Sequence, residues 1–520
     1  MPRAMPTSLI RAKYVITRVT GPDSARVITD GAVYQEDGVI REVGDYRDLR
    51  ARHPDSEVLG STRHLLMPGL VNDHDHVGFS AVQLGVPHLP LELSGLARFG
   101  ARELDPYLEH LWGAVQMIES GTTAVQIMYT PGRGAAPIDP VTTDKVIRAY
   151  QDAGLRLAYA PNLQDQNSLV ASPKGGEKEF AASLPPDVGK RFSDFMARSY
   201  VPLDEVLSLS EGLFKKYNGA SGGRVIVNTA PTNVQRCSDD MIVGLKRLSH
   251  KYKTTSHIHL LETVYQKRFG HRIYGTSAVK HLQDIGFLGP DAVCGHTVWA
   301  TDDDIAILKS TGASVCHNAS SNFRLRSGIA PVHRFVQEGV RVAIGTDDMG
   351  LNDDKDMFQE MRLVLKLHRL PGVDFTPLTT FQVLEMATTN GAYCSGFGGK
   401  IGALEPGMRA DMTLVDLSRL DQPYLNPDTP IVEALVQRAR GVDVDTVIVD
   451  GEVLMKGRRL TTIDKKALLK DIHQALDRPL TERELERKAL GHAVSPHLKA
   501  FYSKAMGDLG APHSQYNSRG

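Results

Sequence analysis

Two histidines one residue apart close an apolar run near residue 70. The run ends in the sequence MPGLVNDHDH, which places His74 and His76 two positions from each other. Side chains i and i+2 of a strand point to the same side, so both imidazoles would face one point. Imidazole is a common ligand of divalent metals. The pair predicts a metal site only if other segments supply further ligands.

Further metal-binding residue types follow other apolar runs of the chain. His259 lies within the motif HIHLLET, and His296 ends the run AVCGH. Asp347 follows the run VAIGT. Histidines and an aspartate gathered at one edge of a fold provide the donors that a divalent metal needs.

The middle of the chain alternates strand-like apolar runs with helix-like stretches. The eight strand candidates cover residues 66–72, 123–128, 155–160, 224–229, 255–259, 292–295, 313–317 and 341–346. Eight β/α alternations predict a (β/α)8 TIM barrel of the α/β class, with its active site at the C-terminal ends of the strands. The five residues named above lie at or near such ends.

Both ends of the chain are rich in shorter strand-like segments. The candidates cover residues 10–17, 25–34, 39–43, 58–60, 410–416 and 442–451. We therefore expect a small β-sandwich formed by residues 1–66 and 401–465, beside a barrel at 67–400. Residues 466–520 are expected to form a helical C-terminal extension that ends in a frayed tail.

The bulk composition excludes several classes of protein. The chain has 520 residues, is 41% hydrophobic and 23% charged, and carries a net charge of −1. This balance gives no field for nucleic acid or an anionic membrane, and no apolar run approaches the roughly 18 residues of a membrane span. Four cysteines without paired spacing predict free thiols. A cytoplasmic protein with a small-molecule substrate is expected.

Five motifs occur in a fixed order along the chain. They are MPGLVNDHDH, HIHLLET, GHTVWATDDDIAIL, CHNASSNFRLRSGIAPV and GTDDMGLNDDKDMFQEMR. With these motifs the chain resembles the amidohydrolase superfamily over residues 8–460, in particular the aminohydrolases and chlorohydrolases that act on N-heterocycles. The resemblance also implies a homo-oligomer, a dimer or larger.

The resemblance implies one divalent metal ion, held by His74, His76, His259 and Asp347. Zinc is the first expectation for such ligands, with iron, cobalt and manganese as alternatives. Relatives with two metals bridge them with a lysine on strand four, and residues 224–231 contain no lysine. A single metal is therefore expected.

Catalytic roles also follow from the resemblance. The metal would lower the pKa of a water molecule toward neutrality. Asp347 would accept the water's proton, and Glu262, at the position of the family's proton-shuttling glutamate, would protonate the leaving group. His296 takes the place of the family's histidine that contacts the water or the substrate.

The motifs describe water activation and leave the broken bond open. The expected reaction is hydrolytic deamination of an amino-substituted N-heterocycle. The alternatives are hydrolysis of an amide, urea, carbamate, thiocarbamate or aryl chloride at the same site, and, more remotely, a metal-free scaffold without activity. The turn DDMGLNDD after Thr346 is more acidic than the resemblance implies for adenosine-type deaminases, which argues against a purine nucleoside.

Residues after strand seven have two interpretations each. His317 could contact the substrate or serve packing. Ser321 and Asn322 could line the substrate pocket, or they could satisfy the backbone of their own loop.

Three further features are predicted from the sequence alone. His257 is expected to face away from His259 and to be structural, and His368 to lie on the surface or in a loop. The long connection at 164–223 is either a lid or pocket element, or a surface insertion without a catalytic role.

Overall fold

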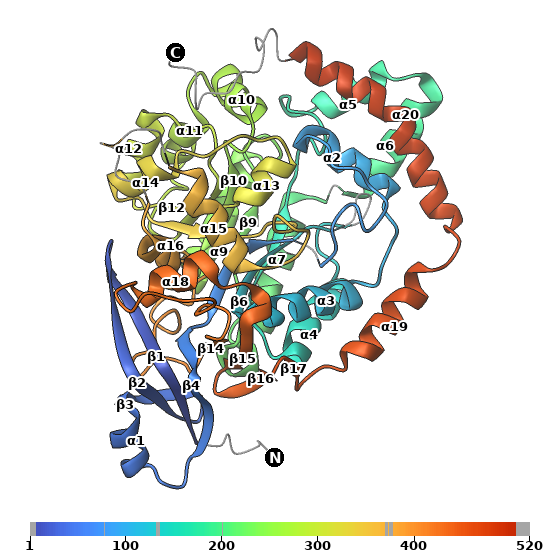
Figure 1. Ribbon diagram of the computed structural model, residues 1–520. Helices are drawn as coiled ribbons and strands as arrows, with labels where there is room; N and C mark the ends of the chain where they lie inside the picture. Colours follow the sequence, from blue (N-terminus) through green and yellow to red (C-terminus); the bar gives the residue numbers. More distant parts are fainter. Residues whose placement is uncertain are drawn as a thin grey trace.

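The chain forms two parallel sheets surrounded by helices, beside one mixed sheet built from both ends of the sequence. The computed structural model describes residues 7–76, 78–131, 136–199, 201–369, 373 and 378–505, and Figure 1 shows their arrangement. The predicted frayed tail lies at residues 506–520, outside the described residues.

The parallel strands confirm the predicted β/α alternation. One sheet has the order β5-β6-β7-β8, with β9 paired to β7, and the other has the order β10-β11-β12-β13. Their bounds are Leu70–Asp75 (β5), Thr122–Tyr129 (β6), Arg156–Leu163 (β7), Val225–Val227 (β8), Ala230–Pro231 (β9), Ser256–Leu260 (β10), Ala292–His296 (β11), Ser314–His317 (β12) and Val342–Ile344 (β13).

Helices follow or precede these strands in the chain. Those between the strands are α2 (Leu91–Ala97), η1 (Arg98–Gly100), α3 (Pro106–Glu119), α4 (Pro140–Ala153), α9 (Asp239–Tyr252), α10 (Val264–Tyr274), α11 (Ala278–Asp284), α12 (Asp302–Thr311), α13 (Ala319–Arg324) and α14 (Val332–Glu338). After β13 come α15 (Met357–Leu367), α16 (Thr380–Met386), α17 (Thr389–Cys394) and α18 (Ile431–Arg438).

Local sequence explains these elements. All eight residues of β7 are buried, as expected of a parallel strand covered on both faces. Helix α4 begins with Asp139, whose side chain accepts a hydrogen bond from the Thr142 amide, and has Pro140 at its first turn. It ends at Gly154, where φ is 81°. These are the usual start and stop signals of a helix.

The first predicted barrel strand, at 66–72, is divided in the structure. Residues 57–68 form one strand, β4 (Glu57–Pro68), which belongs to the mixed sheet, and β5 begins after Gly69. A Cβ atom at Gly69 would lie 2.1 Å from Thr123 Oγ1. The lack of a side chain therefore lets the chain pass close to β6 as it crosses from one sheet to the other.

The terminal strands join in one eight-stranded sheet of order β17-β16-β15-β14-β4-β1-β2-β3. Its remaining strands are β1 (Ser8–Gly21), β2 (Ser24–Glu36), β3 (Val39–Asp45), β14 (Met412–Asp416), β15 (Val444–Val449), β16 (Glu452–Lys456) and β17 (Arg459–Leu460), with α1 (Tyr46–Arg52) and η3 (Gly441–Asp443) in connections. The four C-terminal strands lie side by side in this sheet, and the pairing of β14 with β4 joins them to the four N-terminal strands.

A buried cluster of charges joins the mixed sheet to the parallel strands. Arg156 of β7 is 1% exposed and donates to both carboxylate oxygens of Asp411, at 2.9 and 2.8 Å. It also donates to Asp450 at 2.7 Å. A buried arginine needs such partners, because an unpaired buried charge is costly.

The long connection at 164–223 and the C-terminal extension are both helical. The connection contains α5 (Gly176–Ser183), α6 (Pro186–Met196), η2 (Ala197–Ser199), α7 (Leu203–Tyr217) and α8 (Ala220–Gly223). The extension contains α19 (Lys465–Leu476) and α20 (Glu482–Ala505), drawn in red in Figure 1. Helix α20 packs against α2, η1 and α6.

Two sequence expectations concern the chain as a whole. All four cysteines are free and buried, which confirms that they form no disulfide framework. Among the described residues no helix is long and apolar enough to cross a membrane.

Candidate metal centre and active-site cavity

The end of β5 meets the turn that follows β13. The Asp347 amide donates to the His74 carbonyl at 2.8 Å, and the His76 amide donates to the Asp347 carbonyl at 3.3 Å. Asp347 has φ of 55°, a conformation that L residues adopt rarely and that is frequent at functional sites. Residues that are distant in sequence are thereby fixed next to each other.

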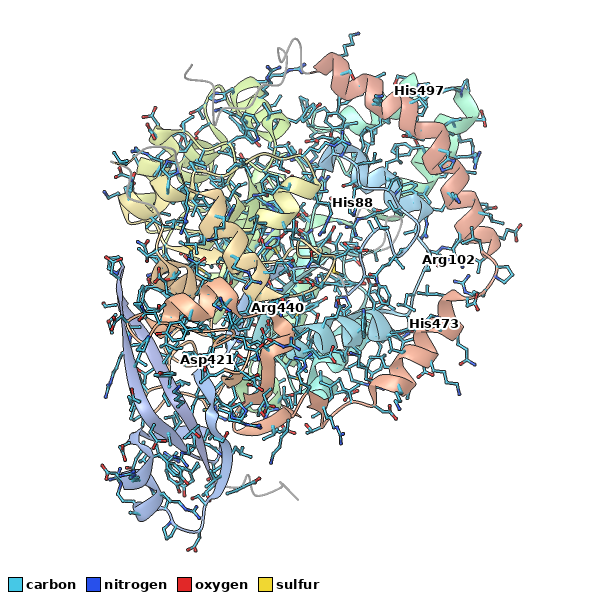
Figure 2. The ribbon with its side chains drawn as sticks, viewed as in Figure 1. His88, Arg102, Asp421, Arg440, His473 and His497 are labelled. Carbon is cyan, nitrogen blue, oxygen red and sulfur yellow. The ribbon has the colours of Figure 1, made fainter. Side chains whose placement is uncertain are left out.

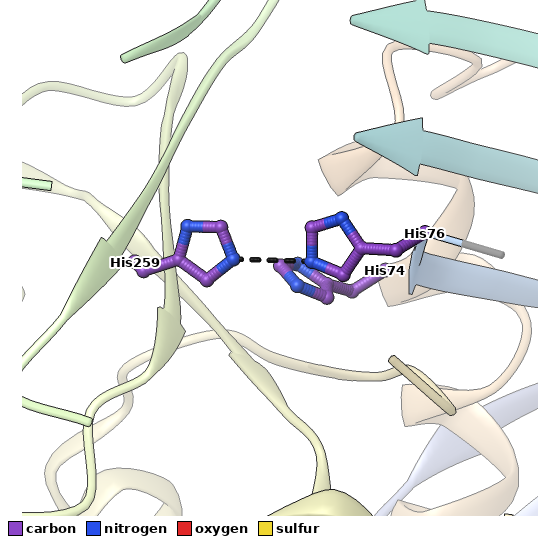
Figure 3. Close-up of side chains that lie close together, drawn as sticks. All are labelled: His74, His76 and His259. Atoms are coloured by element: carbon purple, nitrogen blue, oxygen red, sulfur yellow. Dashed lines mark hydrogen bonds between the residues drawn. The ribbon is translucent and has the colours of Figure 1, made fainter. Parts of the chain in front are cut away.

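Three histidines and one aspartate converge at this point. The Nε2 atoms of His76 and His259 lie 3.2 Å apart, as Figure 3 shows. Asp347 Oδ1 lies 3.2 Å from His76 Nε2 and 3.6 Å from His74 Nε2. In each of two sets of residues, the donor atoms lie within 4.8 Å of one another. One set is His74, His76 and His259, and the other is His74, His296 and Asp347. The arrangement brings together the residues expected from the sequence.

The donors fit a divalent metal ion. Both ring nitrogens of His74 are buried and have no hydrogen-bond partner among the residues that the structure describes, which is costly unless a ligand completes them. Burial lowers the pKa of His74 and of His259 well below the usual range, and a metal-binding imidazole must be neutral. For His76, burial lowers the pKa, but the contacts with Asp347 outweigh it and raise the pKa to about 9. The Asp347 carboxylate therefore favours a positive charge where the donor atoms of the four residues converge.

Backbone carbonyls orient two of the histidine rings. His76 Nδ1 lies 2.5 Å from the Met128 carbonyl, and His259 Nδ1 lies 2.8 Å from the Thr232 carbonyl. A carbonyl can only accept, so each Nδ1 carries the proton and each Nε2 is left as an electron-pair donor. Such outer contacts fix both the tautomer and the direction of a metal-binding imidazole.

Glu262 and His296 lie beside the four convergent residues. His296 Nε2 is 3.8 Å from Glu262 Oε1 and 3.9 Å from Asp347 Oδ2. Burial raises the pKa of Glu262, which favours the protonated form of the carboxyl group. The Gln266 side chain donates to Glu262 Oε2 at 3.3 Å and accepts from the Glu262 amide at 2.9 Å, so the group is held in place.

The three residues expected to contact substrate lie behind these groups. Ser321 donates to Asp347 Oδ2, and Asn322 Oδ1 lies 2.8 Å from His296 Nδ1. His317 Nε2 lies 3.0 Å from His368 Nε2 in a buried pair. None of the three is among the described residues that line the cavity beside the site. Two of them instead orient side chains of the centre.

Two other histidines are buried in the structure. His368 lies in the turn after α15, one of the two positions expected for it, but it is 2% exposed rather than on the surface, because it pairs with His317. His257 does not face away from His259, since residues two positions apart share a face of a strand. It lies deeper along the same strand, 1% exposed, with Nε2 at 3.1 Å from the Cys394 carbonyl. A structural role fits this position.

A buried ion pair is formed by Asp75, the residue between His74 and His76 in the sequence. Lys355 Nζ is 2.6 Å from Asp75 Oδ2, and both side chains are fully buried. Asn72 and Thr346 also donate to Asp75 Oδ2, each at 2.9 Å. Lys355 further donates to the carbonyl of Asp348. The network ties the strand that bears His74 and His76 to the turn that bears Asp347.

A cavity of about 550 Å³ opens beside the convergent residues. His76, His259, Glu262, His296 and Asp347 all line it. Further lining residues come from α2 and the loop after it, the segment after β9, the 164–223 connection and α20; among them are Glu92, Arg98, Arg102, Glu103, Leu169, Arg236, Tyr265, Arg483, Arg487 and Tyr502. The 164–223 connection therefore contributes to the cavity.

Several of these lining residues were not predicted from the sequence. Glu92 lies in the apolar helical segment LELSGLA, is 9% exposed, and accepts a hydrogen bond from Thr263 at 2.5 Å. Burial raises the pKa of Glu92 to about 7. A single acid inside an apolar helix was the available signal. Arg236 has no comparable signal, because nothing in its sequence surroundings distinguishes it from a surface arginine.

Comparison with known proteins agrees with the geometry. A sequence model described as "Amidohydrolase family" matches residues 65–454. The chain belongs to the amidohydrolase family. It is a hydrolase that acts on carbon–nitrogen bonds, and its donor set is that of a divalent-metal site. A second model, described as "Imidazolonepropionase-like composite domain, bacteria", matches residues 31–55.

Relatives within the family include two kinds of deaminase. A 5'-deoxyadenosine deaminase of Methanosarcina mazei is 32% identical over 476 residues, which is 90% of this chain and 97% of the relative. A 5-methylthioadenosine/S-adenosylhomocysteine deaminase of Syntrophomonas wolfei is 30% identical over 463 residues, 87% of this chain and 95% of the relative. These names weaken the sequence argument against a purine nucleoside.

Solved structures of the family share the fold. An adenosine deaminase from Xanthomonas campestris with bound zinc has a TM-score of 0.75 and 25% identity, covering 92% of this chain and 99% of that chain. An atrazine chlorohydrolase variant from Arthrobacter aurescens, complexed with zinc and atraton, has a TM-score of 0.77 and 20% identity over 90% of this chain and 99% of that chain. This amidohydrolase thus has a TIM-barrel-like α/β fold.

Proposed function

We propose that this amidohydrolase removes the amino group of an N-heterocycle by hydrolysis, and that the ring is the adenine of a nucleoside. The observation that carries the proposal is the convergence of four donor residues and Glu262 at one end of a cavity of about 550 Å³. The names of the relatives support the choice of ring, because deaminases of 5'-deoxyadenosine and related nucleosides match nearly the whole chain.

His74, His76, His259 and Asp347 are the proposed ligands of a single zinc ion. A divalent ion in this position supplies Lewis-acid activation of water. The unpartnered nitrogens of His74, the neutral state that burial favours, and the carbonyl contacts that aim Nε2 of His76 and His259 inward all support this assignment.

The proton transfers are assigned to two carboxyl groups. Asp347 accepts a proton from the attacking water, and Glu262 delivers a proton to the ring nitrogen. The proton on Asp347 then passes to the amino group, which leaves as ammonia, and Glu262 regains its proton from the new hydroxyl as the ring carbonyl forms. His296 contacts the water or the oxygen that develops on the ring carbon, since it lies within 4 Å of both carboxylates. Burial of Glu262 supports its role, because a raised pKa favours the protonated form that donates a proton.

The finer architecture is also part of the proposal. We place a closed (β/α)8 barrel at residues 67–400, with a β-sandwich from 1–66 and 401–465 and the helical extension at 466–520. Two bridges support closure: Asp75 pairs with Asp347, and Thr229 pairs with Ser256, each joining one parallel sheet to the other. A homo-oligomer, a dimer or larger, in the cytoplasm stays a prediction from family resemblance and composition.

The test is a substrate screen that detects ammonia and other products separately. Zinc-loaded protein is incubated with adenosine, 5'-deoxyadenosine and S-adenosylhomocysteine, and in parallel with an amide, a carbamate and an aryl chloride. Ammonia from at least one nucleoside, absent in protein stripped of metal by chelation, is the expected result. Turnover of an amide, carbamate or aryl chloride without ammonia from any amino-heterocycle would overturn the proposed reaction.

A further inference from the structure

The C-terminal helix α20 contributes to the active-site cavity although it lies outside the residues matched by the family model, which end at 454. Arg483, Arg487 and Tyr502 of α20 are among the lining residues. Figure 1 shows α20 running along the side of α2 and α6. The helix therefore faces the part of the cavity wall that α2 and its following loop provide.

One arginine of α20 holds the loop at residues 98–104. Arg487 Nε donates to the Phe99 carbonyl at 2.9 Å, and Nη2 donates to the Ala101 carbonyl. Nη1 forms an ion pair of 2.5 Å with Glu103 Oε1. The Arg487 side chain is only 10% exposed. Charge-assisted bonds from a partly buried, planar guanidinium fix geometry more strongly than bonds between neutral groups.

A second contact fixes the far end of the same loop. Glu484 Oε1 accepts a hydrogen bond from the Glu103 amide at 2.8 Å, and Glu484 is itself held by Arg478 at 2.6 Å. Arg102, labelled in Figure 2, donates to the Arg478 carbonyl at 2.7 Å. The 98–104 loop is thus tied to the extension at both ends, and every one of its residues except Gly100 lines the cavity.

The apolar side of α20 holds a second segment of the wall. Leu490, Val494, Leu498 and Tyr502 pack in one buried cluster with Leu96, Phe99, Leu169 and Val170. The Tyr502 hydroxyl donates to the Leu169 carbonyl at 2.6 Å. Residues 169–171 line the cavity. The helix therefore positions two separate segments that face the same space.

The wall held by α20 is strongly polar. Arg98, Arg102, Glu103 and Arg483 all border the cavity. Arg98 pairs with Asp348, the residue after Asp347, whereas Arg102 bonds to the Arg478 carbonyl and Arg483 pairs with Glu103. Such a surface suits a hydroxylated or charged substituent of the substrate rather than the reacting ring.

We propose that α20 is a specificity element of the substrate site: it positions the 98–104 loop and residues 169–171 so that they recognise the polar substituent attached to the heterocycle. Arg487 is a positioning residue in this scheme, since it acts through the loop. The assignment of a substituent rests on the proposed deamination function. The positioning itself does not depend on which substrate is turned over.

The test compares Arg487→Met with Lys499→Met in the full-length, zinc-loaded protein. Lys499 is an exposed residue of the same helix and serves as the matched control. In Arg487→Met we expect faster amide hydrogen exchange in peptides covering 98–104, unchanged exchange in 255–262 and unchanged metal content. For a nucleoside that the wild type deaminates, KM should rise about tenfold with kcat within about twofold, because binding is lost without loss of the chemical groups.

Two further variants keep the inference open to refutation if Arg487→Met does not fold. Arg487→Lys retains the charge but cannot reach three acceptors, and Tyr502→Phe removes only the bond to Leu169. Unchanged exchange at 98–104 with unchanged KM, or a fall in kcat together with metal loss, would overturn the role of α20. If the wild type turns over no nucleoside, the function proposal fails, and the exchange data still decide whether α20 holds the loop.

Discussion

The metal centre and the α20 side of the cavity are built in different ways. The centre takes its side chains from the ends of β5, β10 and β11 and from the turn after β13, and hydrogen bonds orient His76, His259 and Asp347. The opposite wall takes its residues from a loop and from a helix 384 residues further along the chain, joined by the Arg487–Glu103 pair. Strand ends of a packed sheet place atoms accurately. The 98–104 loop is held by a few charged contacts. Its residues can therefore change without altering the residues of the metal centre.

The largest expected effect comes from removing a ligand of the centre. His259→Ala should lose bound metal, and turnover should fall by about a thousandfold or more, since metal activation contributes several kcal/mol to the transition state. Metal analysis by mass spectrometry and an ammonia assay measure the two effects. The control is His257→Ala on the same strand, which should retain the metal. Full metal occupancy in His259→Ala would exclude this residue as a ligand.

Glu262→Gln should separate proton transfer from metal binding. The amide is similar in size to the carboxyl group but cannot shuttle a proton, so kcat should fall by roughly 10²–10⁴-fold while metal content stays unchanged. The measurement is steady-state kinetics together with metal analysis on the same sample. Wild-type turnover in this variant would refute the assignment of Glu262.

Lys355→Met should show how much the buried Lys355–Asp75 ion pair contributes to stability. The change leaves Asp75 as a buried carboxylate without its cation, and the free energy of unfolding should fall by about 3 kcal/mol or more. Chemical denaturation measures the loss. In the double variant with Asp75→Asn, part of the loss should be recovered, because no buried charge remains. If the double variant were as unstable as the sum of both single variants, the two side chains would not be coupled.

Glu484→Gln should give a smaller effect that depends on pH. The hydrogen bond from Arg478 holds the pKa of Glu484 well below its usual range, so the carboxylate stabilises the folded protein above the unfolded pKa. That contribution is lost as pH falls below about 4. Denaturation of wild type and variant should therefore differ by about 1–3 kcal/mol at pH 7. A difference that does not shrink between pH 5 and pH 3 would contradict this reason.

The sequence predicts the centre far better than the wall. The β/α alternation and the strand ends follow from local apolar patterns, and the motifs identify His74, His76, His259 and Asp347, which the structure brings together. The exceptions are local as well: Gly69 divides a predicted strand between two sheets, and His257 shares a face of its strand with His259 instead of facing away from it. The contacts of Arg487 with the 98–104 loop carry no local pattern. They arise only when the chain has folded, so composition and spacing could not predict them.

The pairing of β4 has a consequence for the order in which the protein folds during synthesis. On one side β4 pairs with β1, which leaves the ribosome first, but on the other side its partner is β14 at residues 412–416. The whole barrel region is made between these two strands. Until β14 emerges, this edge of β4 has free amide and carbonyl groups that can pair with another chain. A shortened chain that ends before residue 412 would keep this edge open permanently, and we expect it to aggregate.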